Sequence, residues 1–315
     1  MLDPLLFSVF VIIASVLILF KSADYVVYGI SRYARKLGLS DLLAGLVVVS
    51  LAASMPEVIA SLTGIMVGKE EVLFGTMLGT NMVHLALVFG VLSIVGKKIK
   101  LECELLDKKL WLLWLVLLVP FVLMADGNLS RIDGIILLVF YALYLGVLWV
   151  RESSSSHLKH RVLMKTIWRD ALIFMLSLVA LLLAGRWLVF GAVNAASILG
   201  VSAYFISLTV IAFAGALPDF AVGLRSILKG HQAIGVGDVL GSVVLEFLLF
   251  FGLVGLLHPL TFSFAEIANA VIFLVIALTY VLFLVKKKSM TWKNGVVLIA
   301  LYVMFLIVEI TKLVR

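Results

Sequence analysis

The chain alternates long apolar stretches with short charged segments, and this alternation limits its fold more than any other feature. A membrane-spanning helix needs about 20 mostly apolar residues. Ten predicted spans meet that requirement: residues 4–30, 41–66, 72–95, 109–125, 130–150, 170–196, 203–228, 234–257, 263–285 and 293–311. Hydrophobic residues make up 64% of the chain and charged residues 14%, whereas soluble domains have about 25% charged residues. The sequence therefore predicts an all-α polytopic membrane protein.

The basic residues indicate how these spans cross the membrane. With the N-terminus outside, 20 of the 25 Lys and Arg residues fall on the inner side, in line with the positive-inside rule. We therefore expect both termini outside. The net charge of +7 is spread over short connecting segments, which excludes a basic nucleic-acid-binding domain. The single Cys103 excludes an internal disulfide, and the apolar run 5–20, which lacks a basic leader, is expected to be a retained first span.

The chain also contains an internal repeat. A shift of 162 residues aligns 29–90 with 191–252 without a gap, and it places "ASMPE" (53–57) on "GALPD" (215–219) and "GTMLGTNMVH" (75–84) on "GDVLGSVVLE" (237–246). Each half contains five predicted spans, an odd number, so the second copy must enter the membrane upside down. We predict two inverted five-helix repeats, 1–150 and 170–315, joined by a cytoplasmic linker, 151–169. This plan is common in secondary transporters, whose binding sites lie at the repeat interface near mid-membrane.

Two acids hold equivalent positions in the repeats, each directly after a proline. Glu57 follows Pro56, and Asp219 follows Pro218. Because proline lacks a backbone N–H, it frees carbonyl oxygens in the preceding turn. Carboxylate and carbonyl oxygens together suit Na⁺ or Ca²⁺. A charged group in a membrane span is costly and usually functional, so this pair predicts a cation site.

The next span of each repeat supplies a polar face. Thr76, Thr80 and His84 are spaced four residues apart, and Asp238, Ser242 and Glu246 hold the same places in the second repeat. Residues with this spacing share one face of a helix. We expect Glu57, Asp219 and Glu246 to meet in one compartment with Asp238 nearer its entrance, while Ser50 and Ser54 share the face of Glu57. His84 has two interpretations, a structural hydrogen-bonding residue or a titrating group opposite Glu246.

The repeats, the Pro-acid motifs and the Gly-x-x-x-Gly-[Ser/Thr] helices together resemble the cation/calcium exchanger superfamily, and most closely its prokaryotic sodium/calcium exchanger-like proteins. The resemblance covers nearly the whole chain. It implies a secondary antiporter of a prokaryotic plasma membrane that exchanges a divalent cation, expected to be Ca²⁺, for Na⁺ by alternating access. Its partners would be inorganic cations and the lipid bilayer, without a cofactor.

The resemblance also implies which residues hold the ions. The set comprises Glu57 and Asp219 after the prolines, Ser50, Ala53 and Ser54 before the first proline, Ala212, Gly215 and Ala216 before the second, the hydroxyls of Thr80 and Ser242, and the polar residues His84 and Glu246, with Asp238 beside Gly237.

The sequence departs from the family pattern at several of these positions. Ala53, Gly215 and Ala216 lack the usual hydroxyls, and Asp219 is one methylene shorter than the usual Glu. His84 stands in place of an amide or acid. Since family Na⁺ sites use those hydroxyls, H⁺ is kept as an alternative counter-ion.

Two further hypotheses come from other residues. "GVGD" (235–238) matches the Gly-x-Gly-Asp signature of intramembrane aspartyl proteases, with Asp219 as the second acid. Such a protease would have no use for Glu57, so an antiporter is the preferred prediction. Asp24 and Arg186 hold equivalent repeat positions with opposite charges, and an ion pair between them is a hypothesis that the structure can test.

Overall fold

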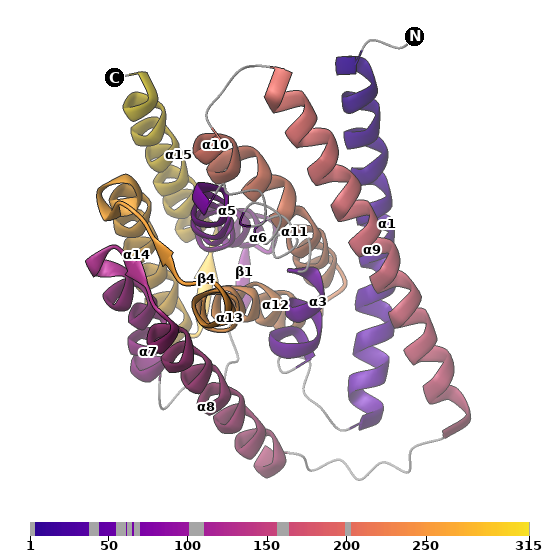
Figure 1. The fold of residues 1–315 in the computed structure, drawn as a ribbon. Coiled ribbons are helices and arrows are strands. Elements are labelled where there is room, and N and C mark those ends of the chain that lie inside the picture. The colour runs from indigo at the N-terminus through magenta and orange to yellow at the C-terminus, as the bar shows by residue number, and fades with distance from the viewer. Residues whose placement is uncertain are drawn as a thin grey trace.

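The computed structural model describes residues 4–37, 44–54, 61, 65, 70–100, 110–155, 164–198 and 203–314. These residues are largely helical (Figure 1). The elements of the first half are α1 (Pro4–Leu37), η1 (Ala44–Val49), α3 (Ser50–Ala53), α5 (Glu70–Met82), η2 (Val83–Val88), α6 (Phe89–Val95), β1 (Lys98–Lys100), α7 (Leu110–Leu123), η3 (Met124–Asp126), β2 (Asn128–Leu129) and α8 (Arg131–Ser155).

The second half contains a similar series of elements. They are α9 (Met164–Ile198), α10 (Ala203–Ile206), η4 (Ser207–Ile211), α11 (Ala212–Leu228), α12 (Gln232–Val244), η5 (Leu245–Phe250), α13 (Phe251–Leu257), β3 (Leu260–Thr261), α14 (Phe264–Lys286), β4 (Ser289–Thr291) and α15 (Trp292–Val314). Of these, η1, η2, η4 and η5 are π-helical and η3 is a 3-10 helix.

The two halves have matching boundaries. A shift of 162 residues carries α5, η2 and α6 onto α12, η5 and α13 with identical bounds. The strands follow the same relation: β1 pairs antiparallel with β4, and β2 pairs antiparallel with β3. The shift turns the pairing of Lys98 with Thr291 into that of Leu260 with Leu129. Each strand pair therefore joins one half of the chain to the other.

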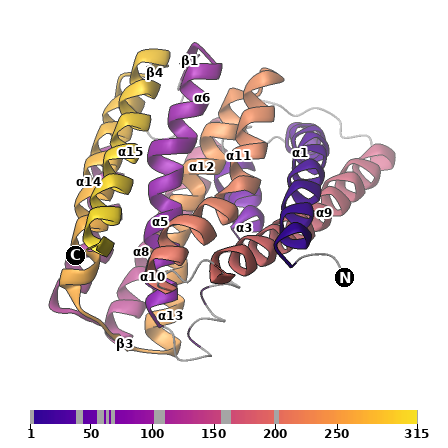
Figure 2. The same ribbon diagram turned by 90° about the horizontal axis from the view of Figure 1, so that it is seen from above.

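The helices form three groups across the molecule. Seen from above, α14 and α15 lie on one side, the segments from α5 to α6 and from α11 to α13 lie in the centre, and α1 and α9 lie on the other side (Figure 2). Helices α1 and α9 pack along each other and run in opposite directions (Figure 1). The two strand pairs lie at opposite ends of the central group (Figure 2).

Apolar residues make these helices suitable for a bilayer. Within the described ranges, seven helices are long and apolar enough to cross a membrane: Val9–Val26, Val72–Val95, Arg131–Leu148, Ser207–Leu228, Gln232–Leu257, Phe264–Lys286 and Trp292–Lys312. Shorter apolar helices lie at Trp114–Asp126 and Ala171–Leu181, within two further predicted spans. The predicted span 41–66 includes residues outside the described ranges. The chain is an all-α polytopic membrane protein.

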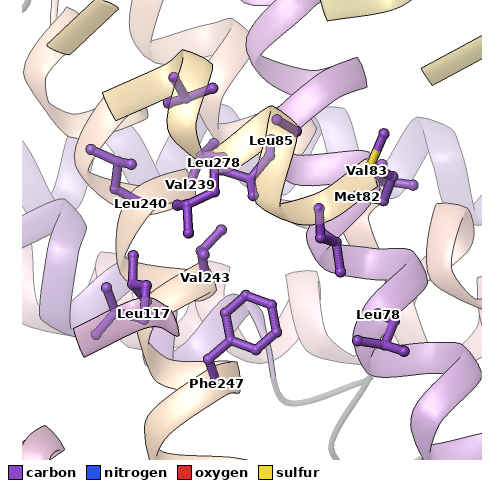
Figure 3. Close-up of a cluster of buried hydrophobic side chains, with 14 of the residues drawn as sticks. Leu78, Met82, Val83, Leu85, Leu117, Val239, Leu240, Val243, Phe247 and Leu278 are labelled. Atoms are coloured by element: carbon purple, nitrogen blue, oxygen red, sulfur yellow. The ribbon is translucent and has the colours of Figure 1, made fainter. Parts of the chain in front are cut away.

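The central helices enclose the main apolar core. Leu78 and Leu85 from the α5–η2 segment lie near Val243 and Phe247 from the α12–η5 segment, and Leu278 of α14 joins them (Figure 3). All five side chains have at most 1% of their surface exposed. Since the polar residues of these same segments are also buried, the core holds them away from both water and lipid.

One predicted ion pair is wrong. Asp24 of α1 does not pair with Arg186. Its carboxylate Oδ1 lies 3.0 Å from Lys229 Nζ and 3.5 Å from Arg225 Nε, at the end of α11. Helix α1 packs against both α9 and α11, and the Asp24 carboxylate lies against the basic residues at the end of α11. The turn after Lys229 uses Gly230 at φ 80°, a conformation that glycine adopts without steric cost.

Candidate cation site

The central helices are irregular where their polar residues lie. His84 is the second residue of η2, and Glu246 is the second residue of η5. A π-helix places one extra residue in a turn and is frequent at functional sites. The same irregularity precedes α11, where η4 ends at Ile211. In the described part of the site, local distortion therefore accompanies the polar positions in both repeats.

Three ionisable side chains meet between α11, η2 and η5. His84 Nε2 lies 2.8 Å from Asp219 Oδ2, and His84 Nδ1 lies 3.8 Å from Glu246 Oε1. Asn81 holds the second oxygen of Glu246, because its Nδ2 donates to Oε2 at 2.7 Å and also to the Met77 carbonyl at 2.7 Å. The imidazole thus lies between two carboxylates.

The site is completely buried. The side chains of His84, Asp219, Glu246, Asn81 and Asp238 all have 0% exposure, as do those of Ser50, Ser54, Thr76, Thr80 and Ser242. Burying ionisable groups without compensation is unfavourable, and more so inside a membrane span. A bound cation would provide that compensation.

Many of the polar atoms here lack hydrogen bonds. Among the described residues, these atoms include both nitrogens of His84, both oxygens of Asp219, the hydroxyls of Ser54, Thr80 and Ser242, and Asn81 Oδ1. His84 Nε2 and Asp219 Oδ2 are close, but their angles are outside hydrogen-bond geometry. Buried polar groups normally have partners. Oxygen and nitrogen lone pairs that no hydrogen bond uses are suited to a cation.

Two glycines bring the helices of the site together. A Cβ atom at Gly241 would lie 2.7 Å from Ser50 Oγ, and a Cβ atom at the equivalent Gly79 would lie 2.7 Å from Ala212 Cβ. In both cases the backbone of the facing helix is also too close for a side chain. The glycines therefore allow the contact that places the residues before each acid against the polar helix of the other repeat.

The other predicted residues lie before the two acids. Ala212 and Gly215 are buried in α11. Ser50 donates a hydrogen bond from its hydroxyl to the Leu46 carbonyl at 2.7 Å. Ala53 ends α3, whereas Glu57 lies outside the described residues. Helix α11 continues through Pro218, so the expected disturbance does not break the helix, although Ala214 has no i+4 N–H to bind.

Asp238 lies where α12 crosses η1. It has 0% exposure, and its backbone nitrogen would lie 2.9 Å from a Cβ atom at Gly45. Its expected place nearer the entrance of the compartment stays a prediction. Asn81 was not among the predicted site residues, and the structure gives it a direct contact with Glu246.

The charged residues do not form a complete metal site by themselves. In the described part of the chain, no three His, Cys, Asp or Glu side chains are arranged to hold a metal ion. A cation between Asp219 and Glu246 therefore needs additional ligands. The buried hydroxyls and main-chain carbonyls around them are oxygen donors of the kind that Na⁺ and Ca²⁺ use.

Comparison with known proteins identifies the family. The family model described as sodium/calcium exchanger protein matches residues 7–150 and 170–311. The chain belongs to the sodium/calcium exchanger family. The two matched segments together contain every described residue of the cation site.

Relatives of this exchanger-family chain come from several prokaryotes. The protein named CaxA of Alkalimonas amylolytica is 32% identical over 261 residues, covering 80% of this chain and 81% of CaxA. The inner membrane protein YrbG of Escherichia coli is 29% identical, covering 81% of each chain. The sodium/calcium exchanger MaX1 of Methanosarcina acetivorans is 23% identical and covers 95% of this chain and 97% of MaX1.

Solved structures of the sodium-calcium exchanger NCX_Mj share the fold. A structure soaked with 10 mM Na⁺ and zero Ca²⁺ matches with a TM-score of 0.80 at 23% identity, covering 95% of this chain and 98% of NCX_Mj. A second, soaked with 2.5 mM Na⁺ and 10 mM Sr²⁺, has a TM-score of 0.81. The exchanger family consists of secondary transporters, so this chain is a multi-pass cation antiporter and not an enzyme. The protease alternative is excluded.

Proposed function

We propose that the chain exchanges a divalent cation, in the first place Ca²⁺, for Na⁺ across a prokaryotic plasma membrane. The observation that carries this proposal is the fully buried cluster of Asp219, His84 and Glu246, around which the hydroxyls of Ser54, Thr80 and Ser242 make no hydrogen bond. Two carboxylates can neutralise one divalent cation, and nearby hydroxyls can complete its oxygen shell. The names of MaX1 as a sodium/calcium exchanger and of YrbG as an inner membrane protein support the ions and the location.

The proposed architecture is ten transmembrane helices in two inverted five-helix repeats with both termini outside. The repeats would be 1–150 and 170–315, with 151–169 as a cytoplasmic linker. The 162-residue correspondence of element bounds and the opposite directions of α1 and α9 support the inversion. The distribution of basic residues supports the orientation.

The proposed ligands come from both repeats. Glu57, Asp219, Glu246 and Asp238 would supply carboxylates, and the His84 imidazole would join them from its place between Asp219 and Glu246. The other ligands would be the hydroxyls of Ser50, Ser54, Thr80 and Ser242 and the main-chain carbonyls of Ala53, Ala212 and Gly215. Gly215 and Ala53 have no hydroxyl, so only their backbone could contribute.

Exchange would follow from the sharing of one site. When a cation neutralises the carboxylates, the site loses most of its charge and can pass through a closed state. Without a cation, the uncompensated charges oppose that closure. Helices α1 and α9 pack along each other and contact the core chiefly through α11. This pair of helices is the proposed moving part, which opens the site to each side of the membrane in turn.

The proposal also names the counter-ion that is exchanged for the divalent cation. Na⁺ is proposed because the carboxylates and hydroxyls here are hard oxygen ligands. H⁺ is the alternative, because Gly215 and Ala216 lack hydroxyls and His84 lies between the two acids.

Uptake of ⁴⁵Ca²⁺ into proteoliposomes tests this proposal. Vesicles are loaded with Na⁺ or with acid and then diluted into Na⁺-free or alkaline buffer, which creates an outward Na⁺ or proton gradient. Ca²⁺ uptake driven by outward Na⁺ supports Na⁺ coupling, whereas uptake driven only by the proton gradient supports H⁺ coupling. Uptake that ignores both gradients would contradict exchange. Glu57→Gln should abolish the driven uptake while the protein still elutes as a folded monodisperse species.

A further inference from the structure

Exposed lysines gather where one of the strand pairs joins the two halves of the chain. Strands β1 and β4 pair antiparallel, and the Trp292 backbone nitrogen donates to the Lys97 carbonyl at 3.1 Å. Figure 2 shows the two strands side by side at one end of the molecule. We name this surface the lysine platform. Its lysines with exposed side chains are Lys97, Lys98, Lys286, Lys287, Lys288 and Lys293.

The lysine platform lies where three apolar helices end. The candidate spans Val72–Val95 and Phe264–Lys286 stop at it, and the span Trp292–Lys312 begins at it. Trp292 is 52% exposed, and Lys293 Nζ lies 5.9 Å from the centre of its ring. An exposed tryptophan at the end of a span is typical of the interface between membrane and water. The lysines therefore lie at the level of the lipid headgroups.

The fold does not require lysines at such a strand pair. The pair β2–β3 lies at the opposite end of the central helices, and residues 124–130 and 258–263 around it contain no lysine. The 162-residue shift places Leu260 at the position of Lys98 and Asp126 at the position of Lys288. Apolar and acidic residues are thus compatible with the same construction. The lysines give positive charge to one end only.

Two lysines of the platform have a backbone conformation that suits glycine better. Lys97 has a φ of 54° and Lys288 a φ of 57°, and the other described residues with positive φ are Gly127 and Gly230. Each of the two lysines directly follows the C-cap residue of a helix, a position where glycine is common because it has no Cβ atom. Lysine therefore occupies these positions although the backbone favours glycine.

The described residues of the platform include no acid. Neither Asp nor Glu occurs in residues 95–100 and 286–294, and Glu102, Glu104 and Asp107 belong to a segment outside the described residues. Clusters of about four to eight basic residues next to a membrane span attract anionic lipids. Lysine ammonium groups bind phosphate as point charges. The charge of the platform is therefore complementary to that of phospholipid headgroups with a net negative charge.

We propose that the lysine platform binds the phosphate groups of anionic phospholipids in the adjacent leaflet of the bilayer. The binding is electrostatic, so it requires an anionic headgroup and weakens as salt screens the exposed charges. The platform shares no residue with the cation site. The inference therefore does not rest on the proposed exchange, and it can be tested without measuring transport.

Native mass spectrometry of the full-length protein in detergent tests this binding. The protein is titrated with phosphatidylglycerol, which is anionic, and with phosphatidylcholine, which is zwitterionic. The wild type should bind phosphatidylglycerol more tightly, and added salt should reduce this preference. In the double variant Lys97→Gly/Lys98→Gln, the affinity for phosphatidylglycerol should fall about fivefold for each lysine, on the order of 25-fold for both.

A second double variant removes the same charge elsewhere. Lys21→Gln/Arg131→Gln changes two exposed basic residues outside the platform and should keep the wild-type preference. Glycine suits the positive φ at residue 97, so Lys97→Gly/Lys98→Gln is expected to fold. Lys286→Gln/Lys287→Gln tests the other side of the platform if it does not, and the salt dependence of the wild type needs no variant.

Three results would overturn the proposal. Equal binding of the two lipids by the wild type, unaffected by salt, would show that the headgroup charge is not recognised. An equal loss in the platform and control variants would show a general effect of net charge. Displacement of bound phosphatidylglycerol by millimolar inorganic phosphate would indicate a site for free phosphate and not for a membrane lipid.

Discussion

Gly241→Ala should destabilise the fold, because Gly241 lies where α12 packs closely against the helix that contains Leu46 and Ser50. In Gly241→Ala, the new Cβ would lie 2.7 Å from Ser50 Oγ and 2.8 Å from the Leu46 carbonyl carbon. Because Leu46 contributes backbone atoms, the helices must move apart. Overpacking of this kind costs about 1–3 kcal/mol. Gly79→Ala should behave in the same way, because its Cβ meets Ala212 and the backbone of η4.

Gly146→Ala is the matched control. Nothing lies within 4 Å of a Cβ atom at Gly146 in α8, so this variant gains only the helix propensity of alanine, roughly 1 kcal/mol. Gly241→Ala gains the same propensity, and the difference between the two variants isolates the overpacking cost. At about 2.1 cal/mol/K of unfolding entropy per residue, each kcal/mol corresponds to roughly 1.5 °C in Tm for a chain of 315 residues. Thermal unfolding in detergent should therefore place Gly241→Ala about 1.5–4.5 °C below Gly146→Ala. Equal Tm values would refute the close crossing.

Three further changes have distinct expected results. Asp219→Asn should abolish ⁴⁵Ca²⁺ exchange but keep or raise the ion-free Tm, because it removes a buried charge that lacks hydrogen bonds; a lower Tm would contradict this. Asn81→Ala removes a 2.7 Å bond to the Glu246 carboxylate and should cost about 1.5–3 kcal/mol in chemical unfolding, whereas no loss would contradict that bond. Asp24→Asn breaks a partly exposed pair with Lys229 and should change stability by at most about 1 kcal/mol in the same assay.

The repeat could be predicted because its signals are rare residues in a rich apolar background. Coincident glycines and Pro-acid pairs at a shift of 162 residues fixed which segments correspond, and the element bounds follow that correspondence. The π-helical turns could not be predicted, because one extra residue in a turn leaves no mark in a continuous apolar run. The strand pairs at 98–100 and 289–291 are too short to show alternation.

The site was predicted in part. The meeting of Asp219, His84 and Glu246 could be expected because helical spacing and the repeat place them on facing surfaces. The depth of Asp238 could not, because burial depends on how closely α12 approaches η1 at Gly45. The contact of Asn81 with Glu246 likewise depends on which side chain of η5 lies opposite, and sequence spacing within one helix does not determine this.

The most direct test of one shared site is counterflow. Proteoliposomes are loaded with unlabelled Ca²⁺, diluted into trace ⁴⁵Ca²⁺ without a Na⁺ or pH gradient, and compared with vesicles that contain Asp219→Asn protein. The account predicts a transient accumulation of ⁴⁵Ca²⁺ in wild-type vesicles that requires internal Ca²⁺ and is absent in the variant. Accumulation that is independent of internal Ca²⁺, or that persists in Asp219→Asn, would contradict alternating access at this site.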